Sequence, residues 1–165
     1  MHCATYVRTH VVRLCCPHMS NKSSPAHLCP RHSIRLITST CVVPIAYTTI
    51  GTADIEKAKA FYLALLHDMN ATIVMDTGRL AAIGTPAGGC MLAVCTPYNE
   101  ESAAPGNGNM VSIAPGSKAL VDSLHAKALE LGGADDGAPG QRMDGFYGAY
   151  FRDIDGNKVC FCDFG

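Results

Sequence analysis

The stretch that decides the fold lies at the carboxyl terminus, Tyr150-Phe-Arg-Asp-Ile-Asp-Gly-Asn-Lys-Val-Cys160-Phe-Cys-Asp-Phe-Gly165. Its centre, residues 153–157, predicts a tight turn, because Asp and Asn hydrogen-bond to nearby backbone while Gly and Asn tolerate a positive φ. The flanks, 149–152 and 158–163, alternate and are rich in aromatic and β-favouring residues. They predict the two strands of a hairpin, with Tyr150 facing a short side chain of the returning strand.

Residues 45–163 are predicted to form two copies of one pattern, a strand, a helix and three further strands. Gly residues separate the short strands of the first copy, and Gly132-Gly133 stops the helix of the second. Thr52 or Asp54 is expected to cap the first helix and Ser117 the second. The first copy is predicted to hold strand 45–50, helix 55–68 and strands 71–75, 79–83 and 90–95. The second is predicted to hold strand 109–114, helix 118–131, a poorly defined strand or loop over 134–143, and the hairpin.

Composition limits the class of protein. The chain has 165 residues, of which 48% are hydrophobic and 16% charged, as is typical of a soluble globular protein. No apolar run approaches the roughly 18 residues of a membrane span. Residues 45–165 contain eight basic and fourteen acidic residues, a balance that argues against nucleic-acid binding. Four cysteines in this part, Cys90, Cys95, Cys160 and Cys162, are interpreted as buried free thiols of a reducing, cytoplasmic environment.

The first 44 residues differ from the rest, since they contain five basic residues, no acidic residue, five of the seven His and five of the nine Cys. Three interpretations remain open for the extension 1–43. It is a targeting peptide, although Pro17, Pro25 and Pro30 would break a helix. It is a metal-binding segment, although its Cys and His spacing matches no paired zinc motif. Or it is a disordered or mistranslated extension, which the lack of periodicity favours.

Two segments resemble the glyoxalase / bleomycin-resistance / extradiol-dioxygenase superfamily, also called vicinal oxygen chelate. The first is Ile45-Ala-Tyr-Thr-Thr-Ile-Gly-Thr-Ala-Asp-Ile-Glu-Lys-Ala-Lys-Ala-Phe-Tyr62, and the second is the hairpin, with Ile154 where the family usually has Pro. Gly106-Asn-Gly-Asn-Met-Val111 resembles the start of the second module. The resemblance implies an α+β fold over 44–165, in which two βαβββ modules (about 45–95 and 109–163) form a curved mixed sheet with a central cleft.

Metal-dependent members of that family place His, Glu or Gln at matched strand positions. The resemblance puts Tyr47, Met110 and Cys160 at three of them, and Met91 or Ala93 near the fourth. Nitrogen and oxygen ligands are therefore missing, and we expect no metal and no cofactor. A thiophilic Cu(I) or Zn(II) on Met110 and Cys160 stays an alternative to plain apolar packing. His67 and His125 fall on the predicted helices and are interpreted as solvated or helix-end residues.

Tyr150 is the candidate catalytic residue. The run Tyr150-Phe-Arg-Asp-Ile-Asp-Gly resembles an extradiol-dioxygenase pattern whose Tyr hydrogen-bonds the substrate, and Cys160 stands where that pattern has Glu. Packing against a neighbouring strand is the alternative role for this ring. Tyr47, Met110, Tyr150 and Cys160 are the predicted ligand-binding residues, because Tyr hydroxyls, Met and Cys suit a flat, mostly apolar ligand.

The sequence thus predicts a protein that binds a small, mostly apolar molecule in a central cleft, with degenerate metal-ligand positions. Two alternatives remain: a metal-dependent lyase (lactoylglutathione lyase-like) or extradiol-type dioxygenase, and a non-catalytic, drug-sequestering resistance protein. The residues do not decide whether any reaction is catalysed. The expected partners are a small-molecule ligand and a second copy in a homodimer, with neither nucleic acid nor membrane.

Overall fold

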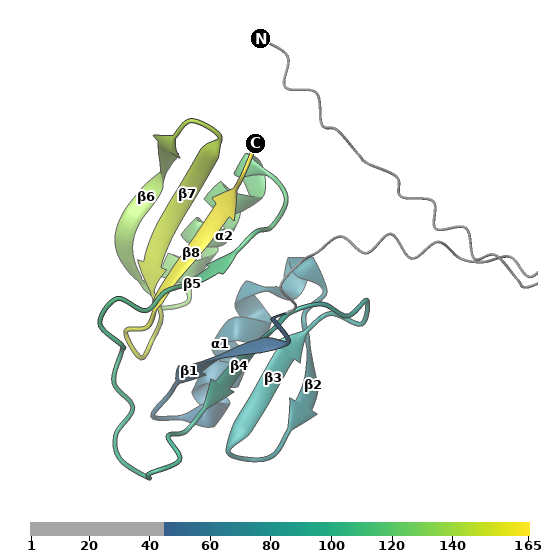
Figure 1. Ribbon diagram of the computed structural model, residues 1–165, viewed down its shortest axis with the longest axis vertical. Helices are drawn as coiled ribbons and strands as arrows, with labels where there is room; N and C mark the ends of the chain where they lie inside the picture. The colour runs from purple at the N-terminus through teal and green to yellow at the C-terminus, as the bar shows by residue number, and fades with distance from the viewer. Residues whose placement is uncertain (1–44) are drawn as a thin grey trace, which may run out of the picture. The chain divides into compact units, whose positions relative to one another are not determined.

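The computed structural model describes residues 45–165, which form two modules of similar order (Figure 1). The interpretations of segment 1–43 fall outside the described residues. The first module consists of β1 (Tyr47–Gly51), α1 (Ile55–Leu65), the short helix η1 (His67–Met69), β2 (Thr72–Asp76), β3 (Leu80–Gly84) and β4 (Met91–Cys95). The second consists of β5 (Val111–Ile113), α2 (Lys118–Glu130), β6 (Ala134–Met143), β7 (Phe146–Arg152) and β8 (Lys158–Asp163).

Each module builds a four-stranded mixed sheet with equivalent topology. The strand orders are β1-β4-β3-β2 and β5-β8-β7-β6. In each sheet the first strand pairs in parallel with the last, and the other neighbours are antiparallel. The α+β fold of two βαβββ modules is therefore confirmed, with the strands in two sheets of four.

The helices begin where the sequence predicts. The Asp54 carboxylate accepts the Lys57 N–H at 3.1 Å, and the Ser117 hydroxyl accepts the Leu120 N–H at 3.3 Å. The first helix is shorter than the predicted 55–68, because its last turn continues as η1 and Asn70 takes a left-handed conformation (φ 56°). Neither α-helix of residues 45–165 has the length and hydrophobicity that crossing a bilayer requires.

The segment 134–143, predicted as a poorly defined strand or loop, is the ten-residue strand β6. Its pairing with β7 shifts register at three places along its length. Bulges of this kind hide the period-2 alternation by which a strand is recognised in a sequence.

Each helix covers one face of its own sheet. In the second module Val121, Leu124 and Ala128 of α2 belong to the same buried cluster as Phe151 and Phe161, whose rings stack at 5.3 Å. Strand alternation then directs the neighbouring Cys160 and Cys162 to the face of the sheet away from α2. The Cys162 sulfur lies 3.2 Å from the Ser112 hydroxyl of β5.

The β7–β8 turn, residues 153–157, joins the second module to the first. The buried Tyr62 hydroxyl of α1 donates to the Asp153 carboxylate at 2.7 Å. The Asn157 side-chain amide donates to the Gly51 carbonyl at 2.9 Å, and the Asp155 carboxylate accepts the Ala53 N–H at 3.0 Å. Burial, and then the Asp153 charge, raise the pKa of Tyr62 far above its ordinary value of 10.0. We call this set of contacts the inter-module joint.

Candidate functional site

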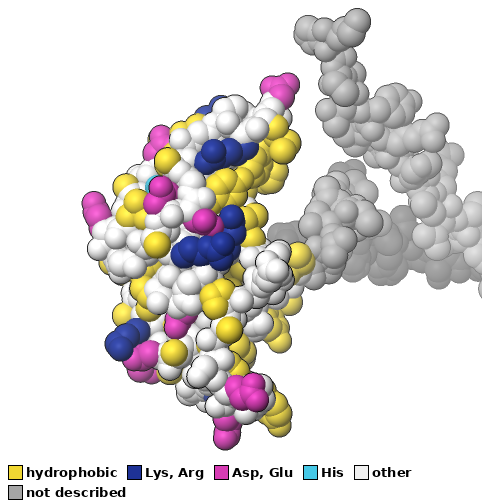
Figure 2. Space-filling model, turned by 90° about the vertical axis from the view of Figure 1, so that its left-hand side faces the viewer, with side chains coloured by type: hydrophobic (Ala, Val, Ile, Leu, Met, Phe, Trp, Pro, Cys, Tyr) yellow, Lys and Arg dark blue, Asp and Glu magenta, His cyan; other side chains and the backbone are white. Residues whose placement is uncertain are grey.

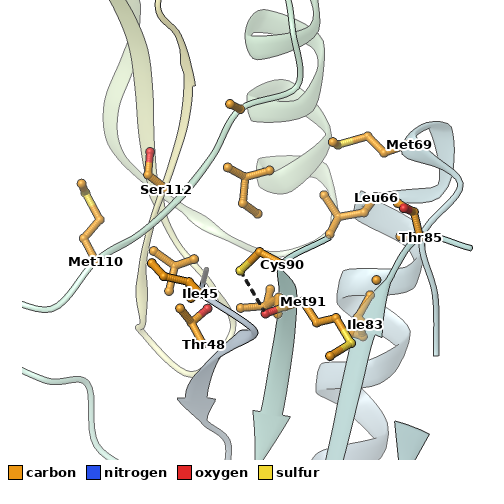
Figure 3. Close-up of a pocket in the computed structure, with 16 residues that line it drawn as sticks. Ile45, Thr48, Leu66, Met69, Ile83, Thr85, Cys90, Met91, Met110 and Ser112 are labelled. Carbon is orange, nitrogen blue, oxygen red and sulfur yellow. Dashed lines mark hydrogen bonds between the residues drawn. The ribbon is translucent and has the colours of Figure 1, made fainter. Parts of the chain in front are cut away.

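An apolar cavity of about 510 Å³ lies between the end of α1, strands β1, β3 and β4, and strand β5 of the other module (Figure 3). Its apolar walls come from Ile45, Leu66, Met69, Ile83, Leu92 and Ile113. The polar groups at its surface are the hydroxyls of Thr48, Thr85 and Ser112 and the Cys90 thiol. No Asp, Glu, Lys, Arg or His within residues 45–165 lines it.

Met91 forms part of the wall, and the nearby Gly84 of β3 leaves room for its side chain. A Cβ atom on Gly84 would come within 2.9 Å of the Met91 Cγ, so a larger residue would push the thioether out of place. Cys90 turns its sulfur toward the Met91 carbonyl, at 3.8 Å (Figure 3). The wall is thus built from flexible, polarizable sulfur side chains, which adapt to irregular ligands.

A second hollow, which we call the polar groove, adjoins this cavity and consists of two overlapping depressions of about 460 and 470 Å³. It is bordered by β1, by the glycine-rich segment 104–110, and by the hairpin residues Arg152, Asn157 and Lys158. Thr48, Met110 and Val111 line both the apolar cavity and the polar groove. Met110 borders every one of these hollows, so it stands at their junction.

The four predicted ligand-binding residues fall at different places. Met110 lines the cavity, whereas Tyr47, Tyr150 and Cys160 are not among its lining residues. Tyr47 is 50% exposed at the start of β1, and Tyr150 is half-buried and pairs with the fully buried Cys160 across β7 and β8. The structure therefore pairs Tyr150 with Cys160, and of the four residues only Met110 lines the cavity.

Two cations flank Tyr150. The Arg142 Cζ atom and the Lys158 Nζ atom each lie 5.1 Å from the centre of its ring. Lys158 also lines the polar groove, so the Tyr150 ring supports a side chain of that groove. The sequence analysis missed both cations, although Lys158 directly follows the predicted turn 153–157 and Arg142 lies one residue before the end of the predicted segment 134–143.

The residues at the positions that the family resemblance assigns to metal ligands do not fit an ion held by oxygen and nitrogen. They supply the Tyr47 phenol, the Met91 and Met110 thioethers and the Cys160 thiol. Burial raises the pKa of the Cys160 thiol and so disfavours the thiolate that binds metals. Within residues 45–165 no three His, Cys, Asp or Glu side chains cluster as a metal site requires. No chemical step is therefore assigned to a metal here.

The two histidines of the described chain differ in environment. His67 is exposed beside Asp68, as expected for a solvated residue. His125 is instead buried, and its Nε2 lies 3.1 Å from the Asp135 carboxylate and 3.2 Å from the Tyr150 carbonyl. The interpretation of His125 as a solvated residue is wrong, because position 125 follows Val121 by four residues and shares its buried helix face.

Comparison with known proteins tests the resemblance to the glyoxalase superfamily. A sequence model of the Glyoxalase/Bleomycin resistance protein/Dioxygenase superfamily matches residues 44–161. The crystal structure of a glyoxalase/bleomycin resistance protein from Albidiferax ferrireducens is 32% identical, with a TM-score of 0.65 over 72% of this chain and 96% of that one. No curated protein matches the chain at a significant level.

Two further structures share the fold. A lactoylglutathione lyase from Agrobacterium tumefaciens is 23% identical, with a TM-score of 0.56 over 74% of this chain and 94% of that one. A glyoxalase/bleomycin resistance protein/dioxygenase family enzyme from Burkholderia phytofirmans is 16% identical, with a TM-score of 0.61 over 74% and 99%. From the match over 44–161 and the 32% identity to the Albidiferax protein, this chain belongs to the Glyoxalase/Bleomycin resistance protein/Dioxygenase superfamily.

Proposed function

We propose that the protein binds a small, mostly apolar molecule in the apolar cavity between its two modules. The observation that carries this proposal is a cavity of about 510 Å³ without a charged side chain among its described lining residues. Small-molecule sites have volumes of roughly 300–1,000 Å³, apolar walls and a few polar groups that orient the ligand. The Thr48, Thr85 and Ser112 hydroxyls are suited to that orienting role.

A neutral fluorescent probe tests the proposal. N-phenyl-1-naphthylamine fluoresces strongly only in an apolar environment, and we expect its emission to rise saturably with one site per chain. Titration of the full-length chain should give a dissociation constant in the micromolar range, which corresponds to a binding free energy of about −8 kcal/mol. A linear, unsaturable rise, or no rise, would show that the cavity does not take up apolar molecules.

We also propose that Tyr150 donates a hydrogen bond to the ligand. Its side chain borders neither the apolar cavity nor the polar groove, so the ligand must extend past Lys158 to reach it. Tyr150→Phe keeps the ring between Arg142 and Lys158, so the free energy of unfolding should change by no more than about 0.5 kcal/mol. Binding of a ligand that accepts from the hydroxyl should weaken by about 0.5–1.5 kcal/mol, measured by competition against the probe. Equal affinity of both proteins for every oxygen-bearing competitor would leave Tyr150 as a packing residue only.

We also propose a homodimer that covers the outer edge of the first sheet. The edge strand β2 is exposed along its whole length, including Ile73, Val74 and Met75 (Figure 1). An exposed apolar edge strand presents unpaired backbone groups with which another chain can pair. Figure 2 shows that hydrophobic side chains also reach the surface between the charged ones on one face of the molecule.

Sedimentation equilibrium at micromolar concentration should give about twice the 17.4 kDa chain mass. Val74→Lys, which places a charge on this edge, should shift the mass toward one chain, whereas the exposed Ala126→Lys on α2 should not. A single-chain mass for the unmodified protein would refute the dimer.

A further inference from the structure

We propose that the ligand is an amphiphilic anion, whose apolar body occupies the apolar cavity while its acidic group binds Lys158 and Arg152 in the polar groove. This inference rests on the proposed function and adds the chemical class of the ligand. It concerns a part of the site that the sequence analysis did not identify.

The apolar cavity and the polar groove adjoin each other. Thr48, Met110 and Val111 border both of them. A molecule seated in the cavity therefore reaches the groove by passing Met110. The Met110 side chain is 45% exposed and unbranched, so it adjusts to the shape of what passes.

Two cationic side chains, Arg152 and Lys158, lie at the far end of the groove. Arg152 Nε and Lys158 Nζ each lie 3.0 Å from the same oxygen of Asp136. These two cations hold the pKa of Asp136 below its ordinary value, so its carboxylate is ionised at neutral pH. Asp136 can neutralise only one of the two cations that it contacts, and the Asp153 carboxylate is engaged instead by the Tyr62 hydroxyl and the Asn157 amide.

These two cations are partly buried, and a neighbouring ring restrains one of them. The side chains of Lys158 and Arg152 are 31% and 38% exposed, so they are partly shielded from water but reachable from the groove. The Tyr150 ring restrains the Lys158 ammonium, which lowers the entropy that an incoming anion must remove. Asn109, which also lines the groove, adds a neutral amide donor.

These features select an anion over other ligand classes. A carboxylate, sulfonate or phosphate monoester gains charge-assisted hydrogen bonds from a guanidinium and an ammonium. A cationic ligand is repelled by the excess positive charge, and a neutral one leaves both donors without a new acceptor. The uncharged cavity beside them requires that the rest of the ligand be apolar.

Two probes of similar aromatic shape separate the two ends of the site. N-phenyl-1-naphthylamine is neutral, and 1-anilinonaphthalene-8-sulfonate carries one sulfonate. In the full-length chain, Lys158→Gln should raise the dissociation constant of the sulfonate probe at least about 10-fold and change that of the neutral probe less than about 2-fold. Lys158→Arg should restore most of the affinity. The control Lys57→Gln alters the same charge on a side chain that is 76% exposed on α1, and should leave both constants within about 2-fold.

Competition on the unmodified protein tests the same inference without a variant. Dodecanoate and dodecyl phosphate should displace the neutral probe at concentrations at least about 10-fold lower than dodecanol does. Their ranking tells whether a carboxylate or a phosphate fits better. Dodecanol is the most hydrophobic of the three, so without an anion site it would compete at least as well.

The outcomes separate the two proposals. Absence of saturable binding by the neutral probe would overturn the proposed function itself. Saturable neutral binding, with dodecanol equal to or better than both anions, would overturn only the anionic end of the ligand. Loss of sulfonate affinity that is equal in Lys158→Gln and Lys57→Gln would assign the effect to net charge and not to the groove.

Discussion

Replacing Asp153 with alanine should lower the free energy of unfolding by about 3 kcal/mol, the largest loss that we expect from one substitution outside the hydrophobic core. Its Oδ2 atom accepts the Tyr62 hydroxyl at 2.7 Å, and its Oδ1 atom accepts the backbone N–H groups of Asp155 at 3.0 Å and Asn157 at 2.8 Å. Alanine leaves these donors without an acceptor where water has little access, since Asp153 is 5% exposed and Tyr62 fully buried.

Urea unfolding of the full-length chain measures this loss, and Asp155→Ala is the matched control. The Asp155 carboxylate makes one exposed contact with the first module, to the Ala53 N–H, so its removal should cost only about 0.5–1 kcal/mol. Similar, small losses from both variants would mean that the inter-module joint contributes little to stability.

Alkaline pH provides a second measurement of the joint. The pKa of Tyr62 is raised in the folded protein, so folded Tyr62 stays protonated at a pH where the unfolded chain ionises it. Its contribution to stability is complete below about pH 10 and declines above it, by about 1.4 kcal/mol per pH unit. Tyr62→Phe should unfold with a smaller pH dependence between about pH 10 and 11. Identical slopes for both proteins would contradict the buried hydrogen bond.

The sequence predicted the local structure around this joint but not the joint itself. The turn residues 153–157 and the alternation of β7 and β8 depend on neighbours in the chain, which local patterns record. The contact between Tyr62 and Asp153 joins residues 91 positions apart. Neither local pattern predicts this long-range contact, and the sequence places Tyr62 only within the predicted helix 55–68.

The candidate site was also predicted only in part from the sequence. The family resemblance predicted Tyr47, Tyr150 and Cys160, which lie on strands, as site residues. The pairing of Tyr150 with Cys160 follows from the predicted hairpin. The apolar cavity instead depends on how the β5 edge lies against the end of α1, and Met69 or Thr85 carries no sequence signal for that arrangement. Arg152 and Lys158 meet at Asp136, which lies at a bulge of β6, and the same irregularity left the sequence prediction for 134–143 open between a strand and a loop.

The second large effect should come from filling the cavity with an indole. Thr48 is half-buried on β1, pairs with Leu92, and points to the cavity (Figure 3). Thr48→Trp adds a rigid bicyclic group to a space of about 510 Å³ that adjoins the polar groove. The affinity for the neutral probe should therefore fall at least about 10-fold, or 1.4 kcal/mol.

Stability should respond much less than binding. Insertion into a close-packed core costs typically 1–3 kcal/mol, because side chains and backbone must move apart. The Thr48 side chain borders empty volume, so the unfolding free energy should change by less than about 1 kcal/mol. The control Ala126→Trp places the same indole on the exposed face of α2 and should alter neither quantity.

If Thr48→Trp binds the probe as tightly as the unmodified chain does, the ligand occupies another part of the molecule. The open face of the second sheet would then be the next place to test, because Arg142 and Lys158 flank the Tyr150 ring there.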